Sequence, residues 1–446
     1  MSSAAEQFAR NMNFGSFAKA EELKKRIWFT LGALIVYRLG TYIPLPGVDS
    51  AVLQDIFKQN ASGLLGMFDM FTGGALSRMT IFALNIMPYI SASIIMQLMT
   101  AISPTLDQLK KEGETGRKKI NQYTRYLTVL ITIMQAYGIA VGIEGTSSSM
   151  GPAVADPGWF FRFTAVITLT GGTMFLMWLG EQITQRGIGN GISLIIFAGI
   201  VANLPTAVAS TLELGRTGSM STLFIIGLLV MSAAVIFFIV FVERAQRRIL
   251  VQYPKRQQGN RMAEGQTTHL PLKLNTAGVI PPIFAGSLLS LPITIIAFSS
   301  GTGPEWMTTL TSYIGRGQPL YLAVYTFLIV FFAFFYTAVV FNPADTAENL
   351  KKYNGFVPGI RPGKNTSEYL DKVLTRLTVV GAAYLSAICL LPEILMSKYS
   401  VPFYFGGTSL LIVVTVTMDT VAQIQSHMLA HQYEGLIKKS KLRGRR

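Results

Sequence analysis

The stretch Ser62–Arg78, SGLLGMFDMFTGGALSR, begins as an apolar helix and is interrupted at Gly73 and Gly74. It is followed directly by a long apolar run, Met79–Ser103, MTIFALNIMPYISASIIMQLMTAIS. A helix from Gly63 to Phe71 covers only ~14 Å of a ~30 Å hydrocarbon core, whereas the second run is long enough to cross it. The sequence therefore predicts a short apolar helix beside a full membrane span.

The whole chain has the composition of a membrane protein. Of its 446 residues, 50% are hydrophobic and only 14% are charged, against about 25% charged in a soluble domain. The apolar runs predict an all-α polytopic membrane protein. Its ten transmembrane helices are expected at 27–45, 79–102, 123–143, 160–180, 190–209, 221–242, 275–298, 319–341, 374–392 and 403–425.

The basic residues indicate which loops face the cytoplasm. Lysine and arginine concentrate in the two termini and in alternate loops, which together hold 31 of the 38. Because basic loops stay inside, both termini are expected to be cytoplasmic. If the short helix crossed, every later loop would change sides, so we expect it to dip into the membrane and return. Its broken backbone at depth requires surrounding protein or a water-filled cavity.

Ten spans divide into five and five, and the odd number predicts an inverted repeat with its functional site between the halves. The expected segments follow from this division. They are a cytoplasmic N-terminal segment 1–26, an N-terminal half 27–211, an outer hinge loop 212–219, a C-terminal half 220–429 with cytoplasmic docking loops 243–273 and 342–376, and a basic cytoplasmic tail 430–446.

No catalytic, metal or cofactor site is apparent in the sequence. His427 and His431 are four residues apart, but the glutamate of a zinc-binding HExxH motif is missing and no acidic cluster accompanies them. The glycine-rich stretch Gly187–Gly191 follows a predicted membrane span and fits a tight turn better than a nucleotide cradle. The single cysteine, Cys389, excludes an internal disulfide.

The centres of the spans are almost free of charge, which argues against coupling to protons or sodium ions. Asp419 and Glu181 lie late in their spans, and Arg38 is in a position to extend towards the outer surface. A secondary transporter of small solutes nevertheless remains the alternative to a channel for a ten-span inverted repeat.

Two pairs of isoleucines have helical spacing. Ile86 and Ile90 are four residues apart in the second span, and Ile192 and Ile196 repeat the spacing in the fifth. On this pattern alone, we interpret them as ordinary packing residues.

Two cytoplasmic loops are long and basic. Their tips are YPKRQQG at 253–259 and FVPGIRPG at 356–363. Attraction to anionic membrane lipids explains the charge, at ~1 kcal/mol per basic residue near the surface. The prolines and aromatic residues also suit loops that project and bind a partner.

Several blocks together resemble the bacterial SecY family, the central subunit of the protein-translocating channel. The resemblance extends from about Lys24 to Lys439. Its main carriers are FTGGALSRMTIFALNIMPYISASII, KKEGETGRKKINQYTRY, TMFLMWLGEQITQRGIGNGIS, THLPLKLNTAGVIPPIFA, FNPADTAENLKK, FVPGIRPG and VPFYFGGTSLLIVV.

The resemblance implies a central hourglass pore between the halves in a bacterial cytoplasmic membrane. It implies a pore ring formed by Ile86, Ile90, Ile192, Ile196, Ile283 and Ile412. It implies a plug, 63–74, that includes Gly63, Leu64, Leu65, Gly66, Met67, Phe68, Phe71, Gly73 and Gly74. It also implies a lateral gate between the second and seventh spans that contains Ser91, Gln97, Asn275 and Leu291.

The resemblance also implies partners. Lys255, Arg256 and Arg361 match loop tips that engage the SecA motor or the ribosome. SecE and SecG are expected as further subunits, and signal peptides and unfolded precursors as the molecules that pass through the pore.

Overall fold

The computed structural model describes residues 21–59, 69, 72–145, 147–148, 151–217, 221–254, 256–258, 261–263, 267–298, 318–399 and 407–443. A helix occupies each of the ten predicted spans. These helices are α3 (Glu21–Gly40), α6 (Met87–Ile102), α8 (Glu114–Glu144), α9 (Trp159–Arg186), α10 (Gly191–Arg216), α11 (Thr222–Arg244), α12 (Ile280–Phe298), α14 (Pro319–Val340), α16 (Lys364–Tyr399) and α17 (Gly407–Arg443).

Shorter elements connect these helices. The short helices are α4 (Ser50–Gln59), α7 (Pro104–Lys111) and α15 (Pro343–Lys352). The strands are β1 (Ser147–Ser148), β2 (Gly151–Pro152), β3 (Gln246–Gln252), β4 (Arg256–Gln258), β5 (Arg261–Ala263) and β6 (Thr267–Lys273). They form three antiparallel pairs, β1 with β2, β3 with β6 and β4 with β5.

Seven helices in the described part of the chain are individually long and apolar enough to cross a membrane. The other three predicted spans depart from this for visible reasons. α6 is long enough to cross only together with α7, from which it is bent by 99°, and the side chains of α12 are described only over Ile280–Leu289. α3 is a 20-residue helix whose first turns carry Lys24, Lys25 and Arg26.

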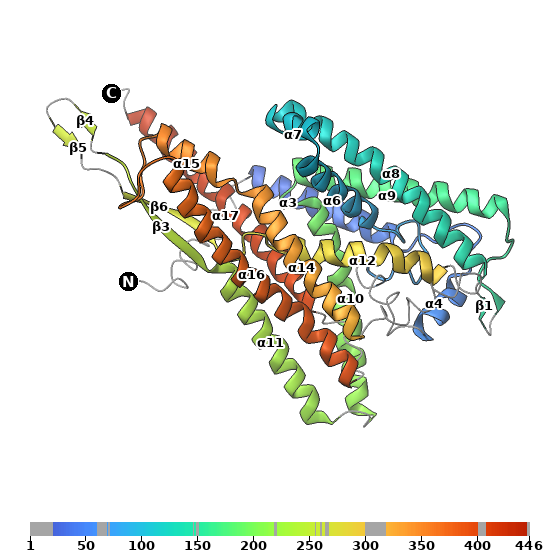
Figure 1. The fold of residues 1–446 in the computed structure, drawn as a ribbon. Coiled ribbons are helices and arrows are strands. Elements are labelled where there is room, and N and C mark those ends of the chain that lie inside the picture. Colours follow the sequence, from blue (N-terminus) through green and yellow to red (C-terminus); the bar gives the residue numbers. More distant parts are fainter. Residues whose placement is uncertain are drawn as a thin grey trace.

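The helices form two groups that follow the chain. In the first group α9 packs against α3, α8 and α10, and α6 packs against α8; in the second group α14 packs against α12 and α16, and α17 packs against α11 and α16. Several contacts join the groups (Figure 1): α12 packs against α6 and α8, α10 packs against α11 and α17, and α17 also reaches α3. The core therefore includes the boundary between the two halves.

The second predicted span begins later than the sequence suggested. Residues 79–86 form turns, and α6 starts at Met87 with Pro88 in its first turn, where a missing backbone N–H costs nothing. Met79 and Asn85 adopt positive φ values, 45° and 49°. The prediction of one continuous helix from 79 was therefore wrong by about two turns.

The turn segment 79–86 fits between neighbouring helices because glycines leave room for it. A Cβ atom on Gly40 would lie 2.0 Å from the Phe82 ring, and one on Gly172 would lie 2.0 Å from the Ile81 carbonyl oxygen. The Phe82 ring stacks on Tyr37 and on Phe175, with centroid distances of 6.2 and 5.9 Å. Close packing thus supports this segment together with backbone hydrogen bonds in its turns and to Ile43 and Leu45.

Other element boundaries also differ from the prediction. α10 continues to Arg216, so the first part of the predicted hinge loop 212–219 is helical. α17 continues to Arg443, which extends the last helix through most of the predicted tail 430–446. Apolar periodicity had placed these ends too early because helical backbone continues into the polar sequence beyond each span.

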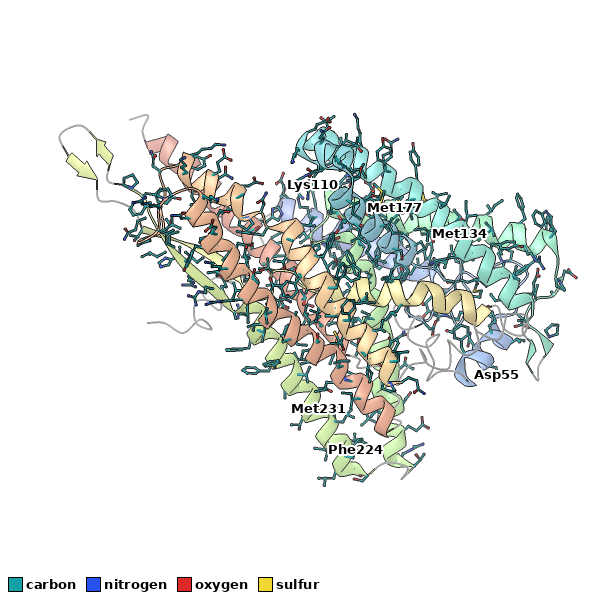
Figure 2. All side chains as sticks on the ribbon, in the orientation of Figure 1. Asp55, Lys110, Met134, Met177, Phe224 and Met231 are labelled. Atoms are coloured by element: carbon teal, nitrogen blue, oxygen red, sulfur yellow. The ribbon has the colours of Figure 1, made fainter. Side chains whose placement is uncertain are left out.

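Large apolar side chains cover the outside of the helices, as expected for a surface that faces lipid (Figure 2). Met134 on α8 is 67% exposed, whereas Met177 on the adjacent α9 is only 3% exposed. On both helices, the exposed side chains face outward and the buried side chains face neighbouring helices.

Candidate functional site

All six isoleucines of the predicted ring belong to one apolar cluster. Ile86, Ile90, Ile196 and Ile412 are 1 to 6% exposed, and the partly buried Ile192 and Ile283 pack against the same cluster. They come from four helices, two in each half of the chain. The apolar cluster that contains them extends through both halves of the chain, and their arrangement as a ring stays a prediction.

Helix ends position part of this cluster. Ile86 is the N-cap residue of α6, and its carbonyl oxygen accepts a 3.1 Å hydrogen bond from the Ile90 amide. At the start of α10, the Asn190 side chain accepts a hydrogen bond from the Ile192 amide. A Cβ atom on Gly191 would lie 1.9 Å from the Gly180 carbonyl oxygen, so only glycine allows α10 to start this close to α9.

The structure describes only the end of the predicted plug. Gly73 and Gly74 have φ values of 69° and 81°, which glycine adopts without strain. The Arg38 guanidinium donates a 2.9 Å hydrogen bond to the Gly73 carbonyl oxygen. The plug positions Gly63, Leu64, Leu65, Gly66, Met67, Phe68 and Phe71 lie outside the described residues.

The two predicted gate helices are in contact. The Ser287 hydroxyl on α12 lies 3.9 Å from the Met87 sulfur on α6, and Ser91 is buried. Gln97 donates to the Ser93 hydroxyl of its own helix at 3.3 Å, and its buried side-chain oxygen has no hydrogen-bond partner in the described part of the chain. The side chain of Leu291 lies outside the described residues.

Asn275 has a partner that sequence reasoning missed. Its side-chain amide donates a 2.7 Å hydrogen bond to the Glu243 carboxylate at the end of α11. The same amide donates a 3.1 Å hydrogen bond to the Gly278 carbonyl oxygen. The resemblance places Asn275 in a gate between the second and seventh spans, whereas Glu243 and Gly278 both lie in its own half of the chain. A glutamate at the end of an apolar helix looks like a boundary residue in sequence, so no signal distinguished Glu243.

The two predicted docking loops form one unit. Gln252 in β3 and Phe356 exchange backbone hydrogen bonds of 2.9 and 3.0 Å. Ile249 and Leu272 from the first loop pack with Val357 from the second and with Leu370 on α16. Segments about 100 residues apart thus present a single surface.

The docking residues are described to different extents. Arg361 is exposed, and its carbonyl oxygen accepts a 3.0 Å hydrogen bond from the Thr366 hydroxyl. Arg256 lies in β4, but its side chain is outside the described residues, as is all of Lys255. The described tip therefore has an ordered backbone with its basic group free to meet a partner.

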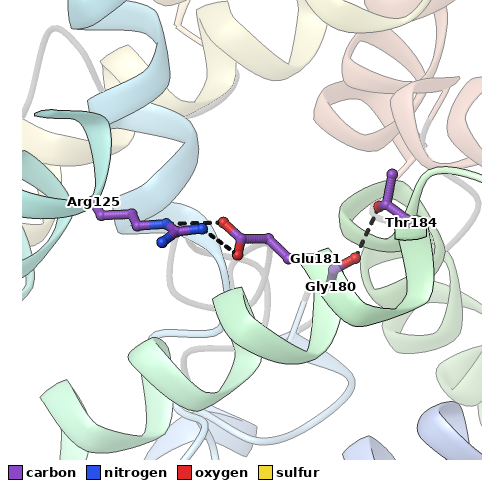
Figure 3. A network of polar contacts seen from close by, with 4 residues as sticks. All are labelled: Arg125, Gly180, Glu181 and Thr184. Atoms are coloured by element: carbon purple, nitrogen blue, oxygen red, sulfur yellow. Dashed lines mark hydrogen bonds and ion pairs between the residues drawn. The ribbon is translucent and has the colours of Figure 1, made fainter. Parts of the chain in front are cut away.

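A polar network joins α8 to α9 (Figure 3). Arg125 forms a bidentate ion pair with the Glu181 carboxylate. The Thr184 hydroxyl donates a 2.8 Å hydrogen bond to the Gly180 carbonyl oxygen. The same hydroxyl accepts a 2.9 Å hydrogen bond from the Gly191 amide. The charge of Glu181 is thus compensated by a neighbouring helix, which fits a structural role.

Comparison with known proteins identifies the family. A family model described as SecY matches residues 80–421. The protein translocase subunit SecY of Escherichia coli K12 is 58% identical over 424 residues, which cover 95% of this chain and 96% of that protein. The corresponding subunit of Rickettsia conorii is 56% identical over 422 residues, covering 95% and 97% of the two chains.

Solved structures share the fold at much lower sequence identity. One, described as a protein conducting channel, has a TM-score of 0.66 and 17% identity, and the match covers 90% of this chain and 92% of that chain. Canine Sec61, in a ribosome-channel complex from the endoplasmic reticulum, has a TM-score of 0.63, the same identity and the same coverage. On the family model and the high identity to translocase subunits, this chain belongs to the SecY family.

Proposed function

We propose that this chain is the channel-forming subunit of a protein translocase, through which unfolded secretory polypeptides cross the membrane. The observation that carries the proposal is that six isoleucines from both halves belong to, or pack against, one apolar cluster. Branched apolar side chains offer no charged or hydrogen-bonding partner to a passing chain, so no sequence is held tightly. The same side chains exclude water and ions when no polypeptide is present.

The proposal places no reaction in this chain. Its relatives are named as translocase subunits, and a channel rather than an enzyme fits the absence of a catalytic constellation in the sequence. We assign the driving force to partners, SecA or the translating ribosome. The joined docking loops with exposed Arg361 support this assignment, and relatives of the same fold have been seen bound to ribosomes.

The other subunits and the location follow by analogy with the family. We assign SecE and SecG as associated subunits and the bacterial inner membrane as the location, with both termini in the cytoplasm. The distribution of lysine and arginine over alternate loops supports this orientation.

We assign lateral release of membrane helices to the contact between α6 and α12. Ser91, Gln97, Asn275 and Leu291 are the proposed gate residues. A contact made by small and polar side chains, such as Ser287 against Met87, is weak enough for a signal helix to replace.

We assign residues 63–74 as the plug that closes the resting pore. A relative of the same fold is described as having a plug domain that stabilises the closed state and maintains a membrane seal. The inability of Gly63–Phe71 to cross the membrane supports the same role here.

Reconstitution tests the proposed function. Vesicles containing this chain with its partner subunits and motor are given a radiolabelled precursor and then protease. We expect full-length precursor to become protected only with an intact signal sequence and only in vesicles that contain the chain. Saturable uptake of a small solute, without any protected precursor, would support the transporter alternative instead.

A further inference from the structure

Two arginines hold the turn at the end of the predicted plug. Arg38 Nη1 and Arg78 Nη2 both donate to the Gly73 carbonyl oxygen, at 2.9 and 3.0 Å. Arg78 Nε also donates to the Gly74 carbonyl oxygen at 2.8 Å. Hydrogen bonds from charged donors are about twice as strong as neutral ones, so this turn is fixed more firmly than an ordinary glycine turn.

Tyr42 orients both guanidinium groups. Both groups lie over the Tyr42 ring. The distance to the ring centroid is 5.1 Å from Arg38 Cζ and 4.2 Å from Arg78 Cζ. Arg38 Nη2 also donates to the Tyr42 hydroxyl at 3.2 Å. Contacts with Tyr42 therefore help to fix the positions of both guanidinium groups beside the turn.

The turn also lies directly against the helix that carries part of the isoleucine ring. A Cβ atom on Gly73 would lie 3.1 Å from both Cα and the carbonyl oxygen of Gly199 on α10. Gly199 follows Ile196 by about one helical turn. Contacts to Gly73 thus connect α3, the turn and α10 at one point.

We propose that Arg38 and Arg78 are positioning residues that latch the turn at Gly73 and Gly74 against α3 and α10, and so set how rarely the resting channel conducts ions. The latch rests on the proposed function, since it has an effect on conductance only if the preceding segment is a plug. Both arginines act through the turn and do not contact a transported chain.

Ion conductance of the complete complex in planar bilayers tests the latch. The variants are Arg38→Gln, Arg78→Gln and the double variant, with Arg216→Gln as the control because Arg216 is an exposed arginine at the end of α10. We expect the resting open fraction to rise about tenfold or more in the double variant and less in each single variant. The control should match the parent.

A glycine pair tests the latch without changing charge. Gly73→Ala introduces a side chain at positive φ and against Gly199, whereas Gly32→Ala on α3 meets nothing within 4 Å. We expect Gly73→Ala to raise the resting open fraction and Gly32→Ala to leave it unchanged. Normal export of a precursor with an intact signal sequence shows that each variant is folded.

A deletion of residues 63–71 separates the two levels of the proposal. If this deletion leaves the resting conductance unchanged, the plug assignment is wrong. If the deletion raises conductance while the double arginine variant and Gly73→Ala do not, the plug assignment stands and the latch is overturned.

Discussion

The side-chain amide of Asn275 donates a 2.7 Å hydrogen bond to the carboxylate of Glu243, and the same amide reaches the Gly278 carbonyl oxygen just before α12. The start of the proposed gate helix is therefore tied to the end of α11. Gly381 on α16 leaves room for this arrangement, because a Cβ atom there would lie 3.2 Å from the Leu274 carbonyl oxygen.

Asn275→Leu removes the donor and leaves the mostly buried Glu243 without that hydrogen bond, at a cost of about 1–3 kcal/mol. We expect the closed gate to become less stable and precursors with defective signal sequences to be exported more efficiently. Glu243→Gln is the matched control, since its side-chain oxygen still accepts from Asn275. Unchanged export of defective precursors in Asn275→Leu would remove Asn275 from the gate.

Gln97→Leu replaces a side chain whose buried oxygen lacks a partner in the described part of the chain. We expect α6 to pack at least as stably, while selectivity among signal sequences shifts because one polar group of the gate is lost. Export of a series of signal sequences graded in hydrophobicity measures the shift. Identical ranking of the series in both proteins would count against a role for Gln97.

Arg361→Glu reverses the charge at the exposed tip of the joined docking loops. We expect export to be blocked while the channel itself still inserts and assembles, because Arg361 makes no side-chain contact that the fold depends on in the described residues. Lys364→Glu, an exposed basic residue three positions later, is the matched charge reversal. Normal export in Arg361→Glu, or an equal block in Lys364→Glu, contradicts the assigned contact.

Gly191→Ala places a Cβ atom 1.9 Å from the Gly180 carbonyl oxygen, so α9 and α10 must move apart. We expect a loss of about 1–3 kcal/mol in stability, typical of overpacking, and a lower Tm of the detergent-solubilised protein. Gly227→Ala on α11 meets nothing within 4 Å and serves as the control. Equal Tm values for the two variants would show that the close approach is dispensable.

The positions of the spans were predictable because apolar runs of sufficient length have few alternatives in a membrane. Their ends were not, as α10 and α17 show, because helical backbone continues after the apolar pattern stops. The turns at 79–86 were missed because they are as apolar as the helix that follows; only Pro88 hinted at the later start.

The resemblance could propose the candidate site as a set of residues, but the sequence could not indicate the contacts that these residues make. Spacing within one helix cannot show that Ile86 and Ile412, more than 300 residues apart, pack in one cluster, and the resemblance supplied that set. The partners of Arg38 and Asn275 depend on tertiary folding. The sequence placed Arg38 where its side chain could extend towards the outer surface, but it did not indicate that the guanidinium donates to the Gly73 carbonyl oxygen.

Crosslinking to a polypeptide arrested in passage tests the central claim most directly. Cys389 is replaced by Ser, and a single cysteine is placed in turn at Ile86, Ile196, Ile283 or Ile412, with the exposed, outward-facing Met134 and Phe237 as control positions. We expect crosslinks to the arrested chain from all four ring positions and none from the controls. Absence of crosslinks at every ring position would contradict the central claim and return these isoleucines to ordinary packing.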